Sequence, residues 1–166
     1  MKLRKLEPKD APFMLQWMHD EDAVAHLQGN FLQKTLQDCL NFIAYSRETE
    51  SDLNLAIVGE DDTYMGTVSL KHIDRQNMDA EFAIAIRPCA MGKGYSRFAM
   101  EQILSKGLEE MDLSRIFWCV SPENKRAVRF YDKGGYRRVE AEEVGAQRYY
   151  PSQRIGQLLW YCVTSK

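Results

Sequence analysis

The chain has 166 residues, 45% of them hydrophobic and 28% charged, which suits one globular domain over residues 1–166 with a real core. Its formal net charge of −2 argues against nucleic acid as a partner, because proteins that bind a phosphate backbone usually carry a basic excess. The four cysteines are scattered, with no CxxC pair and no matching histidines, so neither a metal site nor a disulfide framework is expected.

The sequence carries no signal for export or for a membrane. Its opening, MKLRKLEPKD, lacks the apolar centre of a signal peptide, and no later run approaches transmembrane length. Reduced thiols are the default for scattered cysteines. We therefore expect a cytoplasmic protein that has no membrane partner.

The first half of the chain is predicted to form a strand, two helices and a hairpin. Apolar residues first alternate, as in a strand, and then recur at helical spacing. A good N-cap residue, Thr35, opens the second helix. In chain order, the predicted elements are a strand at 2–6, a helix that opens at 8–10, a loop at 26–31, a helix from Thr35, and strands at 53–58 and 63–73 around a turn at 59–62.

The second half alternates strands and helices. Residues 115–120, RIFWCV, are almost all apolar, as expected for a strand buried on both faces. The tryptophans are assigned to the core. In chain order, the predicted elements are a turn at 74–78, a strand at 79–86, a helix from about Gly94, the strand at 115–120, a helix with Ser121 as N-cap and Pro122 in its first turn that ends at Gly134 and Gly135, and a long hairpin of strands 136–144 and 157–163.

The junction after the strand at 79–86 is the most informative segment. Two glycines, Gly92 and Gly94, separate the strand from the next helix. Glycines allow close approach of backbone N–H groups, and the N-terminus of a helix attracts negative charge, so the segment favours a phosphate site. An ordinary strand-to-helix turn is the alternative. A Rossmann site would need glycine where Arg97 stands, and no GxxxxGK[ST] motif occurs.

Two motifs together resemble one family, the GNAT acyl-CoA-dependent N-acetyltransferases. The segment CAMGKG at 89–94 resembles the family's pyrophosphate loop, Q/R-x-x-G-x-G/A. The segment NKRAVRFYDKGGY at 124–136 resembles its later motif, N-x-x-A/S-x-x-x-Y-x-x-x-G-F/Y. The opening LRKLEPKDAPFMLQWMHD and the two N-terminal helices are most similar to the RimJ/RimL group. One residue departs from the pattern, because Cys89 replaces the usual Gln or Arg.

The resemblance implies a mixed α/β fold with a mostly antiparallel sheet of about seven strands and about four helices, splayed between strands four and five. It also implies acetyl-CoA as co-substrate, held largely by backbone groups, and no metal. Since backbone amides make most of the loop contacts, Cys89 is expected at most to weaken the affinity for the cofactor. The implied cofactor-binding residues are Ile84, Ala85 and Ile86 on strand four, Met91, Gly92, Lys93, Gly94, Tyr95 and Ser96 in the loop, and Asn124 and Ala127 on the later helix.

Tyr131 occupies the family's general-acid position. Acetyl transfer from a thioester expels a thiolate, and a tyrosine with an ordinary pKa near ~10 is protonated at neutral pH and can donate a proton to it. Asn124 lies about two helical turns earlier on the same face, with small Ala127 between them. The alternatives are a core tyrosine and, for Asn124, a local polar contact near the helix start.

Glu81 is the best candidate for the base. Strand alternation places Glu81, Ala83 and Ala85 on one face, and an incoming amine must lose a proton. The segment also resembles that around the strand-four glutamate that serves as base in histone acetyltransferases of this superfamily. A strand-end salt bridge or a solvated glutamate is the alternative.

Other residues are weaker candidates for the acceptor site. His26 lies in a loop that shapes the acceptor pocket in related enzymes, and His72 is less favoured; both are as well explained by structural roles. Acidic groups at 140–143 and at Glu48, Glu50 and Asp52 would attract a cationic acceptor, or simply face solvent. An acetyl-cysteine intermediate on Cys89 or Cys119 is disfavoured, because neither has a histidine nearby in sequence.

The sequence therefore predicts an N-acetyltransferase that moves acetyl from acetyl-CoA to a primary amine by direct attack in a ternary complex. Protein N-termini, polyamines, amino acids, aminoglycosides and amino sugars are all compatible acceptors. The alternative is a non-catalytic acyl-CoA-binding sensor on the same fold. The RimJ/RimL group often forms dimers, so a homodimer is compatible with the resemblance.

Overall fold

A single seven-stranded sheet organises the computed structural model, which describes residues 1–27 and 29–166. The strand order is β1-β2-β3-β4-β5-β7-β6, and every neighbouring pair is antiparallel except β4 and β5. The predicted mixed α/β fold is confirmed. The strands are β1 (Lys2–Lys5), β2 (Leu53–Val58), β3 (Tyr64–Asp74), β4 (Asp79–Ile86), β5 (Arg115–Val120), β6 (Arg137–Val139) and β7 (Leu159–Thr164).

The sheet separates two apolar layers, because successive side chains of a strand point to opposite faces. On one face, Leu55, Val68 and Phe82 pack with α4 (Tyr95–Ser105) and α5 (Lys125–Lys133). On the other, residues of β2 and β3 pack against α1 (Ala11–Met18) and α3 (Leu36–Glu48). A third cluster on that second face joins β5 and β7 to the segment at 141–158. Trp17, Trp118 and Trp160 are all buried, as predicted.

The N-terminal helices form from local signals. Thr35 caps α3 in a capping box with Asp38, in which each side chain accepts from the other's backbone N–H, so the predicted cap is confirmed. A short helix, α2 (Glu21–Val24), was not predicted. The predicted loop at 26–31 includes residue 28, which lies outside the described residues.

The helix after β5 starts later than predicted. Asn124, and not Ser121, is the N-cap of α5, and its Oδ1 accepts from the backbone N–H of Ala127 at 3.2 Å. Ser121 and Pro122 instead form a turn, in which the Ser121 carbonyl accepts from the N–H of Asn124 at 3.0 Å. Proline at the second position of a turn satisfies the same backbone preference as proline in the first turn of a helix.

The predicted long C-terminal hairpin is largely wrong. Only β6 and β7 pair, and residues between them form a 3₁₀ turn (Ala146–Arg148) and α6 (Ser152–Ile155). The apolar residues of this segment do not alternate as in a strand. Instead, Ala141, Val144 and Ala146 pack individually on Phe117 and Trp160. Gly145 permits the sharp turn with φ of 62°.

A buried carboxylate ties this segment to the sheet. Asp79, at the start of β4, is fully buried and accepts from Arg148 Nη2 at 2.7 Å and from Arg115 Nη2 at 2.6 Å. Arg148 also bonds Asp74 at 2.9 Å. Since Tyr149 and Tyr150 follow Arg148 directly, Asp79 fixes the position of both aromatic rings.

We expect Asp79→Asn to lower the free energy of unfolding by about 2 kcal/mol, because hydrogen bonds to charged groups contribute about 1.5–3 kcal/mol and both guanidinium groups lose the buried charge of Asp79, although Arg148 keeps Asp74. Urea unfolding measures the change. The control is Asp112→Asn at an exposed position whose left-handed backbone, φ of 56°, suits asparagine; an equal loss in both variants would contradict the tie.

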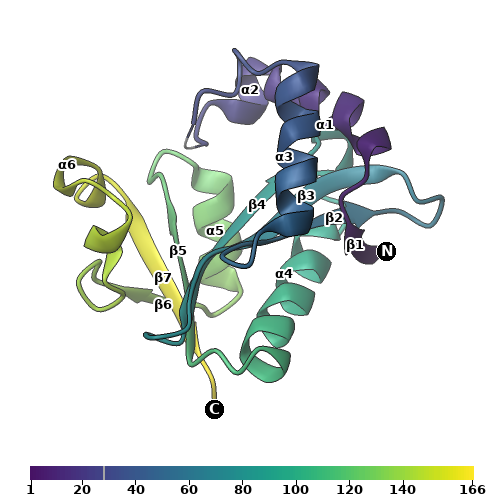
Figure 1. Cartoon of the computed structure of the whole chain (residues 1–166). Coiled ribbons are helices and arrows are strands. Elements are labelled where there is room, and N and C mark those ends of the chain that lie inside the picture. The colour runs from purple at the N-terminus through teal and green to yellow at the C-terminus, as the bar shows by residue number, and fades with distance from the viewer. Residues whose placement is uncertain (28) are drawn as a thin grey trace.

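Strands β4 and β5 part after three residue pairs. Asp79, Ala80 and Glu81 pair with Arg115, Ile116 and Phe117, and beyond them β4 continues to Ile86 and β5 to Val120 without pairing. Figure 1 shows the two strands diverging towards the top of the view, with α5 visible between them. This fork confirms the predicted splay between strands four and five.

Candidate functional site

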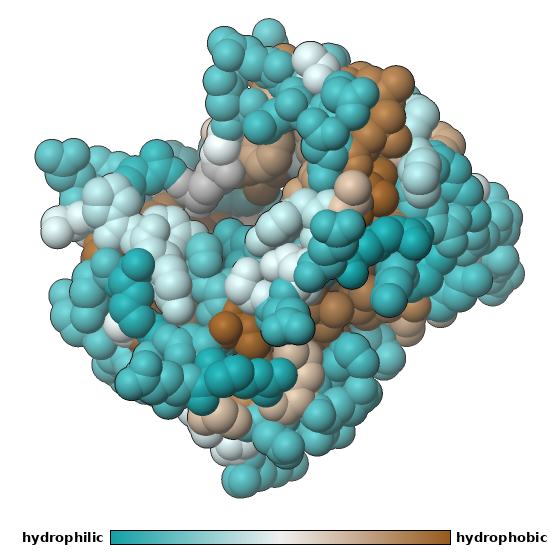
Figure 2. Space-filling view, in the orientation of Figure 1, coloured by the Kyte–Doolittle hydropathy of each residue, from teal (hydrophilic) through white to brown (hydrophobic). Residues whose placement is uncertain are grey.

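A cavity of about 480 Å³ lies at the fork. Figure 2 shows the hollow between the α2–α3 end of the molecule and the C-terminal segment, with apolar residues inside it. The cavity reaches both faces of the sheet, because the parted strands leave a passage between them. Its lining includes seven residues predicted from the sequence: Glu81, Ile84, Ala85, Asn124, Ala127, Tyr131 and His26.

Glu81 is the last β4 residue before the strands part, and its side chain is almost fully buried on the α1–α3 face. The hydroxyl of Tyr150 donates a hydrogen bond to Oε1. Within the described residues Oε2 has no hydrogen bond; His72 Nε2 lies 3.6 Å and Lys71 Nζ 3.9 Å from it. A buried carboxylate with one oxygen free of hydrogen bonds can accept a proton from an amine in the cavity. The alternative of a solvated glutamate is wrong, whereas the alternative of a salt bridge agrees with the ion pair to Lys71.

His72 is held against Glu81 by its backbone and by an aromatic stack. Its φ is 53°, in the left-handed region, its N–H donates to Asp52 Oδ1 at 2.9 Å, and its ring stacks on Tyr149 at 4.1 Å. Burial lowers the pKa of His72, and the charge of Glu81 partly opposes that shift. The imidazole is therefore mainly neutral at pH 7 and is 39% exposed.

Tyr131 lies on the opposite face of the sheet but lines the same cavity. Its ring is buried among Trp118, Tyr136 and Tyr161, at centroid distances of 5.4, 6.5 and 5.2 Å. Within residues 1–27 and 29–166, its hydroxyl has no hydrogen-bond partner. Burial, and secondarily the nearby thiol of Cys119, raises the pKa of Tyr131 far above its usual value. The phenol therefore keeps its proton at neutral pH and can donate it into the cavity.

The start of α5 forms the wall beside Tyr131. The Oδ1 of Asn124 is used in the helix cap, so the expected alternative of a local contact is confirmed for that atom. Its side-chain NH₂ makes no hydrogen bond with the described residues. Trp118 adds a buried indole N–H that has no partner in the described chain. Sequence reasoning assigned Trp118 to packing alone, and no motif distinguishes this donor.

The glycine-rich loop lies outside the cavity lining but has the geometry expected for an anion site. Gly92 and Gly94 have φ of 76° and 87°, and Gly94 is the N-cap of α4. The first N–H groups of a helix have no intrahelical acceptor, so the amides that follow Gly94 are available to a ligand. Arg126 of α5 reaches this loop, with Nη1 3.3 Å from Met91 Sδ, and was missed by the sequence interpretation. Cys89 is exposed in the turn before the loop.

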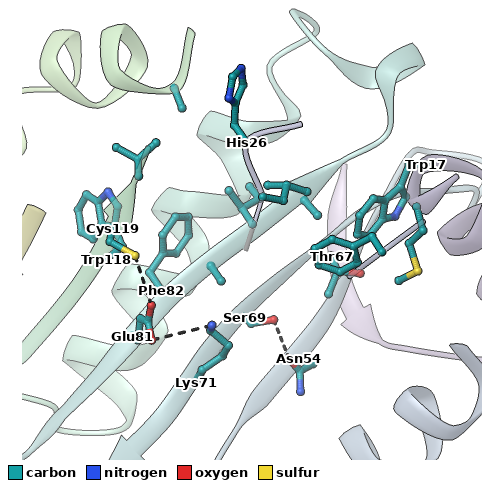
Figure 3. Close-up of a pocket in the computed structure, with 18 of the residues that line it drawn as sticks. Trp17, His26, Asn54, Thr67, Ser69, Lys71, Glu81, Phe82, Trp118 and Cys119 are labelled. Carbon is teal, nitrogen blue, oxygen red and sulfur yellow. Dashed lines mark hydrogen bonds and ion pairs between the residues drawn. The ribbon is translucent and has the colours of Figure 1, made fainter. Parts of the chain in front are cut away.

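The other candidate residues from the sequence differ in their position relative to the cavity. His26 lines the cavity and lies above Ser69 and Lys71 in Figure 3, with its ring directed away from them, whereas His72, the less favoured histidine, is the one that lies beside Glu81. The thiol of Cys119 is 3.9 Å from Glu81 Oε1. Burial and the charge of Glu81 raise the pKa of Cys119 to about 12, which disfavours a thiolate nucleophile at this position. Glu140–Glu143 lie outside the cavity lining.

The described residues contain no helix that is long and apolar enough to cross a membrane. They also contain no group of three or more His, Cys, Asp or Glu side chains placed to hold a metal ion.

The fork, the cavity and the glycine loop are the features expected of an acyl-CoA-dependent acyltransferase. The sequence matches the family described as the acetyltransferase (GNAT) domain over residues 1–137. The chain belongs to this family and is an acetyl-CoA-dependent N-acetyltransferase.

Its relatives include other N-acetyltransferases. The chain is 27% identical over 132 residues to the uncharacterized N-acetyltransferase p20 of Bacillus licheniformis. The matched region covers 78% of this chain and 74% of that protein. It is 28% identical over 144 residues to spermidine N(1)-acetyltransferase of Escherichia coli strain K12, covering 86% and 75% of the two chains.

Solved structures share the fold. Spermidine N-acetyltransferase from Vibrio cholerae, determined with CoA and spermine, has a TM-score of 0.80 at 20% identity and covers 99% of this chain and 95% of that one. A GNAT acetyltransferase from Bacillus anthracis has a TM-score of 0.75 at 22% identity, with coverage of 98% and 93%. At these identities the likeness establishes the fold.

Proposed function

We propose that residues 1–166 act as one domain that acetylates a primary amine by direct attack in a ternary complex. The observation that carries this proposal is the position of Glu81 and Tyr131. They lie on opposite faces of the sheet at the fork, and both line the one cavity that passes between the parted strands. A base on one side and an acid on the other suit an amine and a thioester that meet in that passage.

In the proposed reaction, acetyl-CoA supplies the acetyl thioester. Glu81 takes a proton from the incoming ammonium, so that the nitrogen lone pair can form the new N–C bond. On the unpaired edge of β4, the N–H groups of Ile84 and Ile86 bind the arm that carries the thioester and stabilise charge on its oxygen. Ala85 lines the cavity beside them, while its N–H is directed at β3, because the next alternate residue, Arg87, donates to Met65 of β3. As the C–S bond breaks, Tyr131 donates its proton to the sulfur, and the second proton that the nitrogen loses on becoming an amide restores the phenol.

The remaining predicted residues are assigned to the pyrophosphate, to the arm of the cofactor and to the acceptor. Residues 91–96 border the pyrophosphate, which the backbone N–H groups of Gly92, Gly94, Tyr95 and Ser96 bind at and just before the start of α4. The N–H groups of Met91 and Lys93 already donate to the carbonyls of Pro88 and Ala90, and Arg126 adds a positive charge. Asn124 and Ala127 border the arm of the cofactor, and His26 borders the acceptor. The four free thiols and the use of acetyl-CoA support a reducing compartment, the cytoplasm. The paired N-terminal helices support the RimJ/RimL group.

Release of free thiol from acetyl-CoA, measured with a panel of amines and confirmed by the mass of the product, tests this function. Spermidine belongs in the panel because relatives carry that name, together with amino acids, amino sugars and N-terminal peptides. We expect at least one amine to be acetylated. Saturable CoA binding without turnover on any amine would favour the alternative, a non-catalytic acyl-CoA sensor.

The pyrophosphate loop makes a separate prediction. In Gly94→Ala we expect the KM for acetyl-CoA to rise about tenfold, because a side chain at φ of 87° costs about 1–2 kcal/mol and displaces the amides that follow. The matched control is Gly156→Ala, which has φ of −70° and open space around it. Equal KM values in the two variants would argue against the loop as the cofactor site.

A further inference from the structure

The floor of the acceptor side of the cavity is a ladder of polar side chains from neighbouring strands. Glu81 on β4 is in register with Lys71 on β3, and Ser69 on β3 is in register with Asn54 on β2. Figure 3 shows this row leading away from Glu81 below Trp17 and His26. The other walls of this arm are mostly apolar: Met14, Trp17, Met18, Phe31 and Phe42.

The carboxylates that line this arm, apart from Glu81, already have several donors. Asp38 accepts from the N–H and the hydroxyl of Thr35 at 2.8 and 3.0 Å. Asp52 accepts from the N–H of His72 and from the hydroxyl of Tyr45, both at 2.9 Å. These bonds hold both carboxylates in place, Asp38 through Oδ2 alone, and within the described chain neither carboxylate bonds a lysine of the lining.

The lysines of the lining have no hydrogen-bonded carboxylate in the described chain, although Lys71 forms an ion pair with Glu81. Lys71 Nζ makes no hydrogen bond to any described residue and is 3.9 Å from Glu81 Oε2, beyond hydrogen-bond distance. Lys34, at the rim, contacts no carboxylate within the described chain. Two ammonium groups with free N–H donors therefore face the arm that receives the acceptor.

The next pair along the floor also lacks a partner for a donor. The Ser69 hydroxyl donates to Asn54 Oδ1 at 2.6 Å, and this leaves the Nδ2 of Asn54, which is only 5% exposed, without an acceptor in the described chain. A buried unpaired donor is costly unless a bound group satisfies it. Lys71 and Asn54 thus both carry N–H donors that have no oxygen within hydrogen-bond distance in the described chain.

We infer that the acceptor amine carries a carboxylate next to its reacting nitrogen, as an α-amino acid with an apolar side chain does. The inference rests on the proposed function, since it places the nitrogen at Glu81. Lys71, directly across the ladder, then meets the carboxylate, and the apolar walls receive the side chain. A polyamine presents only cationic donors and would set them against Lys71 and Asn54.

The test compares amino acids with their decarboxylated forms: L-phenylalanine with 2-phenylethylamine, and L-leucine with 3-methylbutylamine, beside spermidine. We expect kcat/KM for each amino acid to exceed that of its partner at least about tenfold, the effect of one charge-assisted hydrogen bond. Equal or better acetylation of spermidine or of the decarboxylated amines would overturn the inference while leaving the proposed function intact.

Lys71→Met separates recognition of the carboxylate from an effect on Glu81. Any change in the basicity of Glu81 alters the rates for both members of a pair, so the ratio between them reports recognition alone. We expect that ratio to fall to near unity in Lys71→Met and to keep its wild-type value in Lys106→Met, a lysine in a surface pair with Glu110. An unchanged ratio in Lys71→Met would overturn the inference. If the protein binds acetyl-CoA but acetylates no amine of the panel, the proposed function fails and the inference fails with it.

Discussion

In Glu81→Gln, kcat/KM for the acceptor amine is expected to fall about a thousandfold at pH 7, within the range of 10²–10⁴ for the loss of a general base. Glutamine has almost the same shape and can still accept from Tyr150, but it cannot take a proton. In the proposed reaction, Oε2 of Glu81, with His72 and Lys71 nearby, receives the proton. Steady-state thiol release measures the loss.

The pH profile of this variant distinguishes the loss of a base from a structural fault. Without Glu81, only amine that is already deprotonated in solution reacts, so log kcat/KM should rise with pH with a slope near one up to the pKa of the amine. Glu110→Gln, at an exposed surface ion pair, is the control and should retain wild-type rates. A uniform decrease at every pH, together with weaker CoA binding, would contradict the assignment.

Most of the fold could be predicted because its signals are local. The strands β4 and β5 have the predicted bounds, since the apolar runs at 82–86 and 116–120 each end at turn-forming residues. The start of α3 was fixed by Thr35 in the same way. The wrong predictions concern segments whose local sequence is compatible with two different structures. Ser121 and Pro122 suit a turn as well as a helix start, and the turn is what forms.

The site could be predicted where a motif carries it, and not where distant segments meet. Tyr131, Asn124 and Ala127 come from one motif, and the structure brings them to one cavity with Glu81. The groups that surround Glu81 come from elsewhere. Tyr150 reaches it from a segment with no periodic pattern, and His72 faces it only because its backbone is left-handed. No sequence motif or spacing predicts either of these contacts.

Tyr131→Phe is expected to lower kcat about a hundredfold and to leave the affinity for CoA nearly unchanged, because the phenyl ring retains the packing and only the proton donor is lost. The hydroxyl has no partner in the described chain, so its removal breaks no internal hydrogen bond. Rapid-quench or steady-state thiol release, with CoA binding measured separately, gives the two quantities. Burial raises the pKa of Tyr131, so the wild-type rate should show no loss of this acid through the moderately alkaline range.

Tyr136→Phe is the matched control for that experiment. Tyr136 belongs to the same aromatic cluster, with its ring 5.2 Å from that of Trp118, but is absent from the cavity lining. If Tyr131 acts as the acid, only its own variant loses kcat, and a thioester with a more acidic leaving thiol should recover part of the loss because it needs less protonation. Similar losses in both variants would mean that the cluster supports the fork only by packing, and that protonation of the sulfur comes from another donor.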